Sequence, residues 1–308
     1  MKFAQMAKRV FLFILVNLLV MITISILVSA AGMWFHLPRG STQSLAVYSL
    51  IYGFAGAFVS LALSRVMAKW MMGVQVIPPD TDDPQLRELV TTVYGLAQQA
   101  RLPAMPQVGI YESPDINAFA TGPTKSRALV AVSTGLLNSM RRAEVEGVLG
   151  HEITHIANGD MVTMTLLQGV VNAFAFFLSR LLAFVVTQAM RSRDDRDSGG
   201  GGWMQFILSQ VFEMFFILLG SIVVCWFSRQ REFRADAGGA RLAGREKMIG
   251  ALQALQRLHD PEVIAAAANH NQAFQAMQIS GRSGGLAALF SSHPPLEERI
   301  ARLEQATR

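Results

Sequence analysis

Residues 141–160 read RRAEVEGVLGHEITHIANGD and are followed by a long apolar run over residues 161–190. Within this stretch, the spacing of the apolar positions predicts a helix over residues 142–158. His151 and His155 are four positions apart, so a helix places them on one face. The chain is therefore expected to present two imidazoles together at the end of a helix that leads into an apolar segment.

The pattern His151-Glu152-x-x-His155 has the residue types and spacing of a zinc site in metalloproteases. Both imidazoles can reach one zinc ion at about 2.0–2.1 Å. Glu152 lies one residue further around the helix, beside the metal, where its carboxylate can take a proton from zinc-bound water. The alternative is a surface helix with two unrelated histidines. We expect one Zn²⁺ per chain and hydrolysis of peptide bonds.

A catalytic zinc needs a third protein ligand and an open position for water. No further histidine follows closely after His155, and the best candidate is Glu232, on a predicted helix that leaves a later apolar run. Asp236, one turn further on, can accept a hydrogen bond from a zinc-bound histidine and fix its tautomer. From spacing alone, Glu232 can also be an ordinary charged residue next to a membrane segment.

The composition is that of a membrane protein. Hydrophobic residues make up 51% of the 308 residues and charged residues 16%, against about 25% charged in soluble domains. The first apolar run is longer than the roughly 7–15 residues of a signal-peptide core, so we expect a retained helix and not a cleaved signal. The apolar runs are Val10–Ala31, Leu45–Met67, Met161–Met190 and Trp203–Phe227.

The net charge of +5 does not indicate a nucleic-acid partner, because Lys and Arg cluster at the ends of the apolar runs. The positive-inside rule places both termini and residues 70–160 in the cytoplasm, and four crossings agree with this. The single cysteine, Cys225, lies in an apolar run and excludes an intramolecular disulfide. We expect a lipid bilayer as partner; no feature of the sequence specifies the oligomeric state.

Two charges interrupt the last two apolar runs. Arg180 and Glu213 are equidistant from the midpoint between Arg196 and Asp197, so a helical hairpin places them at similar depth. A lone charge in the hydrocarbon costs several kcal/mol, and pairing lowers that cost. We hypothesise that the two pair or line a polar cavity near the active site; alternatively, the hairpin lies partly outside the hydrocarbon and each charge meets water.

The predicted fold is a mostly α integral membrane protein, with four apolar helices and a cytoplasmic zincin-like α+β protease domain holding a small sheet of about three strands. The strands are expected at residues 107–111, 117–121 and 129–133. The expected parts are an N-terminal hairpin (1–72), the first part of the protease domain (73–160), a second hairpin (161–228) and the second part of the protease domain (229–308).

Four motifs follow one another along nearly the whole chain: Asn117-Ala-Phe-Ala-Thr-Gly122, His151-Glu-x-x-His155, Glu232-Phe-x-Ala-Asp236 and Ser292-His293-Pro-Pro295. Together they resemble the HtpX family of bacterial membrane zinc endopeptidases, which are related to the CAAX prenyl proteases. The resemblance implies that Glu232 is the third zinc ligand. It also implies a multi-pass protein of the bacterial cytoplasmic (inner) membrane with a cytoplasmic active site. Its expected substrates are misfolded or damaged membrane proteins, in stress-related quality control.

Two further site residues or segments are candidates. His293 can donate to the oxyanion of the tetrahedral intermediate, or it makes only a structural bond at a helix start. Asn117, Ala118 and Phe119 open a predicted strand whose edge can bind an extended substrate, or they belong to the interior of the sheet.

Two rival functions remain open at this point. A prenyl-peptide protease acting on lipidated C-termini is expected to have a larger helical chamber than four apolar runs can build. A membrane adaptor or small transporter with a structural zinc is expected to use four protein ligands, often cysteines, and leaves Glu152 without a role.

Overall fold

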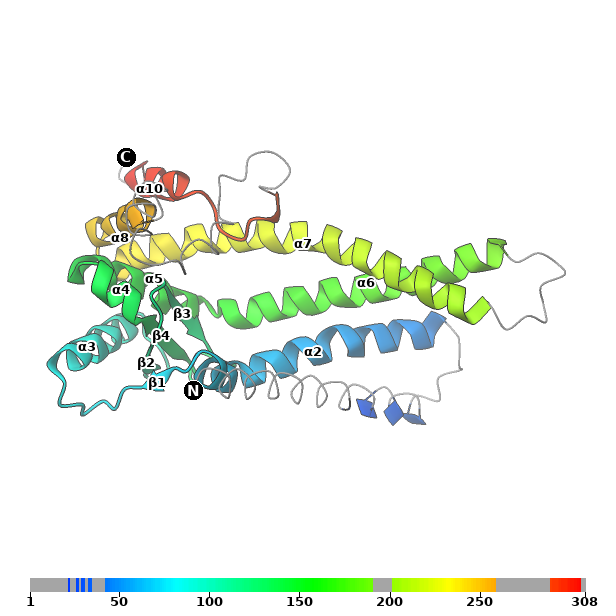
Figure 1. Ribbon diagram of the computed structural model, residues 1–308, viewed down its shortest axis with the longest axis horizontal. Coiled ribbons are helices and arrows are strands. Elements are labelled where there is room, and N and C mark those ends of the chain that lie inside the picture. The colour runs from blue at the N-terminus through cyan, green and yellow to red at the C-terminus, as the bar shows by residue number, and fades with distance from the viewer. Residues whose placement is uncertain are drawn as a thin grey trace. The chain divides into compact units, whose positions relative to one another are not determined.

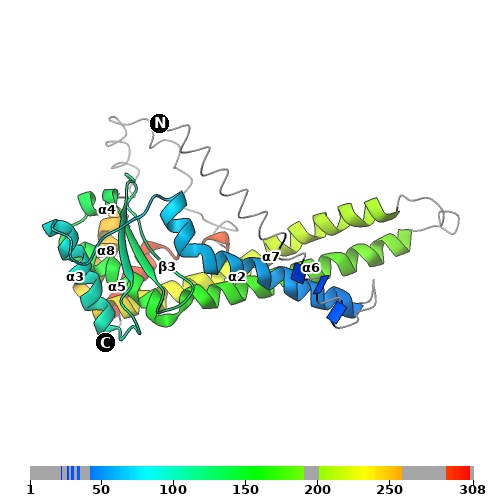
Figure 2. The ribbon, with the colours of Figure 1, turned by 90° about the horizontal axis from the view of Figure 1, so that it is seen from below.

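The computed structural model describes residues 42–190, 201–258 and 289–305, together with isolated helical positions between residues 22 and 34. The chain forms two compact units, whose elements are labelled in Figure 1 and Figure 2. The helical unit comprises residues 1–61 and 163–224. The α+β unit comprises residues 62–162 and 225–308.

Among the described residues, three helices are long and apolar enough to cross a membrane: α2 (Thr42–Met71), α6 (Asp160–Met190) and α7 (Gly201–Leu242). They contain the three later apolar runs expected from the sequence. The fourth predicted membrane helix, over residues 10–31, falls largely outside the described residues. Helix α7 continues without interruption through the predicted helical segment after its apolar run, and this part carries Glu232.

Small residues allow the helices of the helical unit to pack closely. A Cβ atom built on Gly53 of α2 lies 2.5 Å from the backbone nitrogen of Ala173 in α6. One built on Gly169 of α6 lies 2.5 Å from the ring of Phe54. Close backbone approach at glycine is a main source of attraction between helices in lipid, where the hydrophobic effect is absent.

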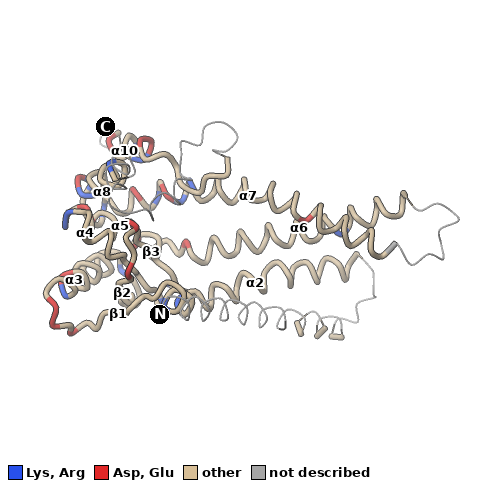
Figure 3. Tube along the Cα trace, in the orientation of Figure 1, with Lys and Arg blue, Asp and Glu red and all other residues tan. Residues whose placement is uncertain are grey.

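The charges in the second hairpin form an ion pair. Arg180 Nη1 donates to Glu213 Oε2 at 2.6 Å, and the guanidinium also lies 3.2 Å from the ring centroid of Phe176. The surrounding lengths of α6 and α7 are almost entirely uncharged, as Figure 3 shows. The pairing predicted from equal depth in a hairpin is therefore confirmed, and it removes two lone charges from an apolar segment.

A four-stranded sheet forms one layer of the α+β unit, in the order β1-β2-β4-β3. β2 (Gln107–Tyr111) is parallel to β4 (Leu129–Ser133), whereas β1 (Gln75–Val76) and β3 (Ala118–Thr121) pair antiparallel with their neighbours. The central strand β4 is buried at every position. The prediction of about three strands missed β1, because two residues are too short to show alternation.

The helices of the α+β unit are α3 (Pro84–Gln99), α4 (Thr134–Ser139), α5 (Arg142–Asn158), α8 (Arg245–Leu258) and α10 (Leu296–Gln305). Helix α5 has the predicted bounds. It packs against α3, α8 and β3, and its side chains Leu149, Ile153 and Ile156 are almost fully buried in the main core. His151 and His155 lie on two neighbouring turns of this helix. Because the buried side chains anchor the helix in the core, they also fix the position of the two histidines.

Candidate metal centre

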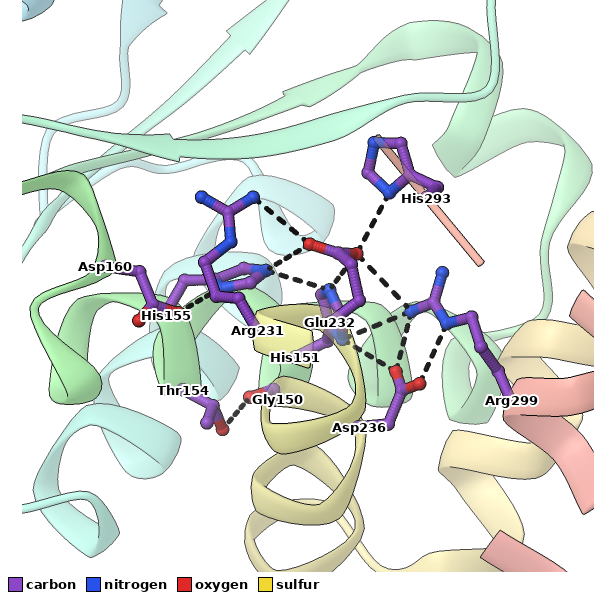
Figure 4. A network of polar contacts seen from close by, with 10 residues as sticks. All are labelled: Gly150, His151, Thr154, His155, Asp160, Arg231, Glu232, Asp236, His293 and Arg299. Atoms are coloured by element: carbon purple, nitrogen blue, oxygen red, sulfur yellow. Dashed lines mark hydrogen bonds and ion pairs between the residues drawn. The ribbon is translucent and has the colours of Figure 1, made fainter. Parts of the chain in front are cut away.

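His151 and His155 lie side by side on α5, as the helical spacing predicts. Both residues are buried, and their Nε2 atoms are 3.0 Å apart. Figure 4 shows the two rings and the Glu232 carboxylate converging on one point, with Arg231 and His293 on either side. The ligand atoms of His151, His155 and Glu232 all lie within 4.8 Å of one another.

Glu232 reaches the imidazoles from α7 and is 1% exposed. Its Oε2 lies 3.5 Å from His151 Nε2, and its Oε1 lies 3.4 Å from His155 Nε2. Two glycines one to two turns further along α7 allow this approach. A Cβ on Gly238 would lie 2.2 Å from Thr154 Cγ2, and one on Gly239 would lie 2.9 Å from the His151 backbone nitrogen.

These three side chains fit a tetrahedral metal ion. Ligand atoms at about 2.0–2.1 Å from such an ion lie about 3.3 Å from each other. The two Nε2 atoms are 3.0 Å apart, and each lies near that distance from one oxygen of the Glu232 carboxylate: Oε2 is 3.5 Å from His151, and Oε1 is 3.4 Å from His155. Two imidazole nitrogens and one carboxylate oxygen are also a donor set of catalytic zinc sites, which leave one position for water.

The outer nitrogen of each ring contacts a carboxylate. His155 Nδ1 lies 2.6 Å from Asp160 Oδ2, and His151 Nδ1 lies 2.9 Å from Asp236 Oδ1. A neutral ring that donates its Nδ1 proton to a carboxylate keeps the lone pair on Nε2. Two lone pairs and one carboxylate then face each other in a buried space, which is an arrangement suited to a cation.

Sequence reasoning missed Asp160 as a contact of the site. The glycine at the end of the predicted helix was a signal for this contact. Gly159 adopts the left-handed conformation, with φ of 73°, and ends α5. A glycine in this conformation reverses the chain direction, so the residue after it can fold back on the last turn of the helix. Asp160 is buried and meets His155 in this way.

Arg299 of α10 was also missed. Its Nε donates to Asp236 Oδ2 at 2.8 Å, and its Nη2 donates to Oδ1 at 2.6 Å. Burial lowers the pKa of the guanidinium, but the bond to Asp236 outweighs this, so the pKa is raised. No sequence pattern connects α7 with α10, which begins 54 residues after α7 ends. Arg231 was missed too; its Nη2 donates to Glu232 Oε1 at 3.1 Å.

The carboxylates make the centre a strong site for positive charge. Burial lowers the pKa of His155, but hydrogen bonds to Asp160 and Glu232 raise it to about 9. The pKa of His151 is also raised: burial opposes this, and bonds to Asp236 and Glu232 outweigh burial. In the metal-free protein, protons on the imidazoles balance the negative charge that a metal ion would otherwise neutralise.

Glu152 is half-buried and follows His151 directly on α5. Within the described parts of the chain, its carboxylate takes part in no hydrogen bond or ion pair. It is close enough to the centre that its charge raises the pKa of both histidines. Its charge therefore acts on the two converging imidazoles, and no described side chain pairs with its carboxylate.

His293 belongs to the same cluster. Its Nδ1 lies 3.0 Å from Glu232 Oε2, and its side chain is 65% exposed. It lies just before α10, so it reaches the centre from a segment near the C-terminus, far along the chain from the histidines of α5. The ring therefore lies between the buried carboxylate and solvent.

The segment Asn117–Phe119 lies at the open edge of the sheet, and β3 packs against α5. Ser133 N donates to Asn117 O, and Phe119 is in register with Ala131. Hydrogen-bonded and non-hydrogen-bonded residue pairs alternate in an antiparallel ladder. The main-chain groups of Asn117 and Phe119 therefore point toward β4, and those of Ala118 and Ala120 point away from it. The Phe119 ring packs on Tyr111, with ring centroids 5.8 Å apart, in a cluster separate from the α5 core.

Comparison with known proteins agrees with this site. Residues 82–307 match the model of peptidase family M48. The chain is 48% identical to the protease HtpX homolog of Methylacidiphilum infernorum, covering 97% of this chain and 99% of the relative. It is 49% identical to protease HtpX of Pasteurella multocida, covering 96% and 98%. The HtpX homolog of Bacillus subtilis is 48% identical, covering 97% and 99%.

A solved structure shares the fold. The crystal structure of S. mikatae Ste24p superimposes with a TM-score of 0.64 at 16% identity, covering 97% of this chain and 67% of that chain. The family model spans most of the chain, and the HtpX relatives match almost from end to end. The chain therefore belongs to peptidase family M48, among its HtpX proteases, and is a membrane-bound metalloprotease.

Proposed function

We propose that the protein is a zinc-dependent endopeptidase of the bacterial cytoplasmic membrane that hydrolyses misfolded or damaged membrane proteins at the cytoplasmic face. The observation that carries the proposal is the buried convergence of His151, His155 and Glu232, at separations of 3.0–3.5 Å, beside Glu152. The cytoplasmic orientation is supported by the basic residues at the ends of the apolar runs.

His151, His155 and Glu232 would hold the ion. When bound, zinc lowers the pKa of its water to about 7 and polarises the scissile carbonyl. Asp160 and Asp236 hold the Nδ1 protons of the two rings, so that both Nε2 atoms remain ligands. Contacts of this kind typically change metal affinity by about 10–100-fold.

Glu152 is the general base of the proposed reaction. Its carboxylate accepts a proton as water attacks the carbonyl, and then passes that proton to the leaving amine nitrogen. Its position beside the cluster, without a competing partner in the described residues, supports this role. The reaction needs no covalent link between enzyme and substrate.

His293 is proposed to stabilise the oxyanion. Its Nδ1 is held by Glu232, so the exposed Nε2 faces solvent and substrate. We propose that Nε2 donates a hydrogen bond to the oxyanion while the tetrahedral intermediate exists.

The edge of β3 is proposed to bind the substrate as an added strand. The outward main-chain groups of Ala118 and Ala120 can each exchange hydrogen bonds with an extended peptide. Neither side chain is larger than a methyl group, so the edge tolerates many substrate sequences. β3 packs against α5, which supports delivery of the bound peptide to the metal-binding face.

The test compares wild type, Glu152→Gln and a control, Glu146→Gln, each purified in detergent, stripped of metal and reloaded with zinc. Glu146 lies on the same helix but pairs with Lys247. We expect each protein to bind one zinc, and wild type and the control to cleave an unfolded protein. Glu152→Gln is expected to bind zinc without turnover. Full activity of Glu152→Gln would refute the assignment of the base, and zinc-independent cleavage would refute the metal mechanism.

A further inference from the structure

Two large apolar side chains are exposed in the α+β unit just before the segment that carries His293. Leu289 is 39% exposed and Phe290 is 42% exposed, in a short helical turn. In Figure 1 this part of the chain runs beside α7 before it reaches α10. Water would meet both side chains if nothing else covered them.

The main chain of this turn is held against α7. Cys225 Sγ donates to Phe290 O at 3.3 Å. Arg229 Nη1 donates to Leu289 O at 3.3 Å and to Ser291 O at 2.7 Å. The turn therefore lies at the level of residues 225–229 of α7.

This level of α7 is where its apolar run ends. Trp203 and Trp226 lie near the two ends of that run, and both are exposed, at 69% and 56%. At about 1.5 Å per residue, the helix between them is about 34 Å long. The hydrocarbon core of a bilayer is about 30 Å thick, and tryptophan concentrates at its two boundaries. Trp226, next to Cys225, thus marks a membrane interface.

We propose that Leu289 and Phe290 insert into the bilayer at this interface, between the headgroups and the acyl chains. The partner is lipid, because the exposed pair is bonded to α7 at Cys225, next to the exposed Trp226 that marks the interface. Arg229 and Arg234 follow on the same helix and match anionic headgroups in charge. The turn is thus a further membrane contact of the α+β unit, besides the helices α2, α6 and α7.

The insertion has a consequence for the metal centre. His293 is three residues after Phe290, and the Ser291 hydroxyl donates to the His293 carbonyl oxygen at 2.7 Å. The stretch is held at one end by Arg229 and at the other by Glu232, which contacts the His293 ring. Lipid around Leu289 and Phe290 would hold the first end more firmly, and would thereby favour the position of His293 beside Glu232.

The depth of the turn can be measured without reference to activity. Cys225→Ser removes the single thiol and keeps a hydroxyl donor for Phe290 O. In that background, a bimane label is placed at Leu289→Cys or, as matched control, at Glu298→Cys on exposed α10. Both proteins are reconstituted in vesicles of phosphatidylethanolamine and phosphatidylglycerol.

We expect lipids brominated near the carbonyl end of the acyl chain to quench the label at 289 severalfold more than the label at 298. Aqueous iodide should show the reverse order. Equal quenching of the two labels by iodide would place the turn in water and overturn the proposal. Protection of the label at 289 from both quenchers would place it against protein, in the chain or in a second copy, and would also overturn it.

The effect on His293 rests on the proposed function and has its own test. The double variant Leu289→Ser/Phe290→Ser is compared with Phe290→Trp for zinc content, KM and kcat in the same vesicles. We expect unchanged zinc content, a severalfold lower kcat in the double variant, and wild-type kcat with tryptophan. Loss of zinc, or an equal loss of kcat in both variants, would refute the link between insertion of the turn and the position of His293. The quenching result does not depend on catalysis.

Discussion

The close approach of α7 to α5 predicts that Gly238→Ala weakens zinc binding. The new Cβ would lie 2.2 Å from Thr154 Cγ2, whereas ordinary contacts begin at 3.4 Å, so about 1.2 Å of separation must be found. Thr154 cannot easily yield, because it is buried, β-branched and bonded to Gly150 O at 2.8 Å. The helices must then move apart, and Glu232 moves with α7.

Metal–ligand distances tolerate only about 0.2 Å, so a displacement near 1 Å removes Glu232 from an ion held by the two histidines. We expect zinc affinity to fall by about 10-fold or more. Overpacking costs about 1–3 kcal/mol, partly offset by about 0.5–1 kcal/mol from placing alanine in a helix. Zinc affinity is measured by competition with a chromophoric chelator, and stability by thermal unfolding in detergent.

Gly95→Ala in α3 is the matched control. A Cβ there meets nothing within 4 Å, so only the gain in helix propensity remains. We expect wild-type zinc affinity and equal or higher stability. If Gly238→Ala bound zinc and cleaved substrate as wild type does, the close helix contact would not be what positions Glu232, and the reasoning would fail.

Three further predictions concern the pairings around the centre and in the membrane. Asp236→Asn should lower zinc affinity by about 10–100-fold, measured by chelator competition, because the Asp236 contact fixes the tautomer of His151; unchanged affinity would contradict this role. Arg180→Met should destabilise the protein by about 3 kcal/mol in thermal unfolding, because it leaves Glu213 without its partner. The double variant Arg180→Met/Glu213→Leu should recover most of that loss, and failure to recover would refute pairing as the cause. Removing zinc with a chelator should lower Tm, since zinc at 100 times its Kd stabilises by about 2.7 kcal/mol, and magnesium should not restore it.

Much of the architecture follows from periodicity. The helix with His151 and His155 has the predicted bounds, and two of the three predicted strands have the predicted ends, because their apolar patterns are long and regular. The pairing of Arg180 with Glu213 was predictable because residues that are equally far from the turn of a helical hairpin lie at similar depth in the membrane.

The residues around the metal ligands were harder to predict for a physical reason. Contacts of Asp236 with Arg299 join helices far apart in the chain, and nothing local in either helix requires the other. The two-residue strand β1 gains its structure from pairing with β2 and carries no pattern of its own. Position in the tertiary structure, and not local propensity, decides such features.

The short, open edge of β3 has a consequence for how substrates are selected. Within β3, Ala118 and Ala120 turn main-chain groups outward, so a peptide bound there as proposed would be held over a few residues by groups that every amino acid except proline can match. A loop that is already hydrogen-bonded in its own fold must first give up those bonds, whereas a denatured loop need not. Discrimination between substrates would then depend on the conformational stability of the polypeptide and hardly at all on its side chains.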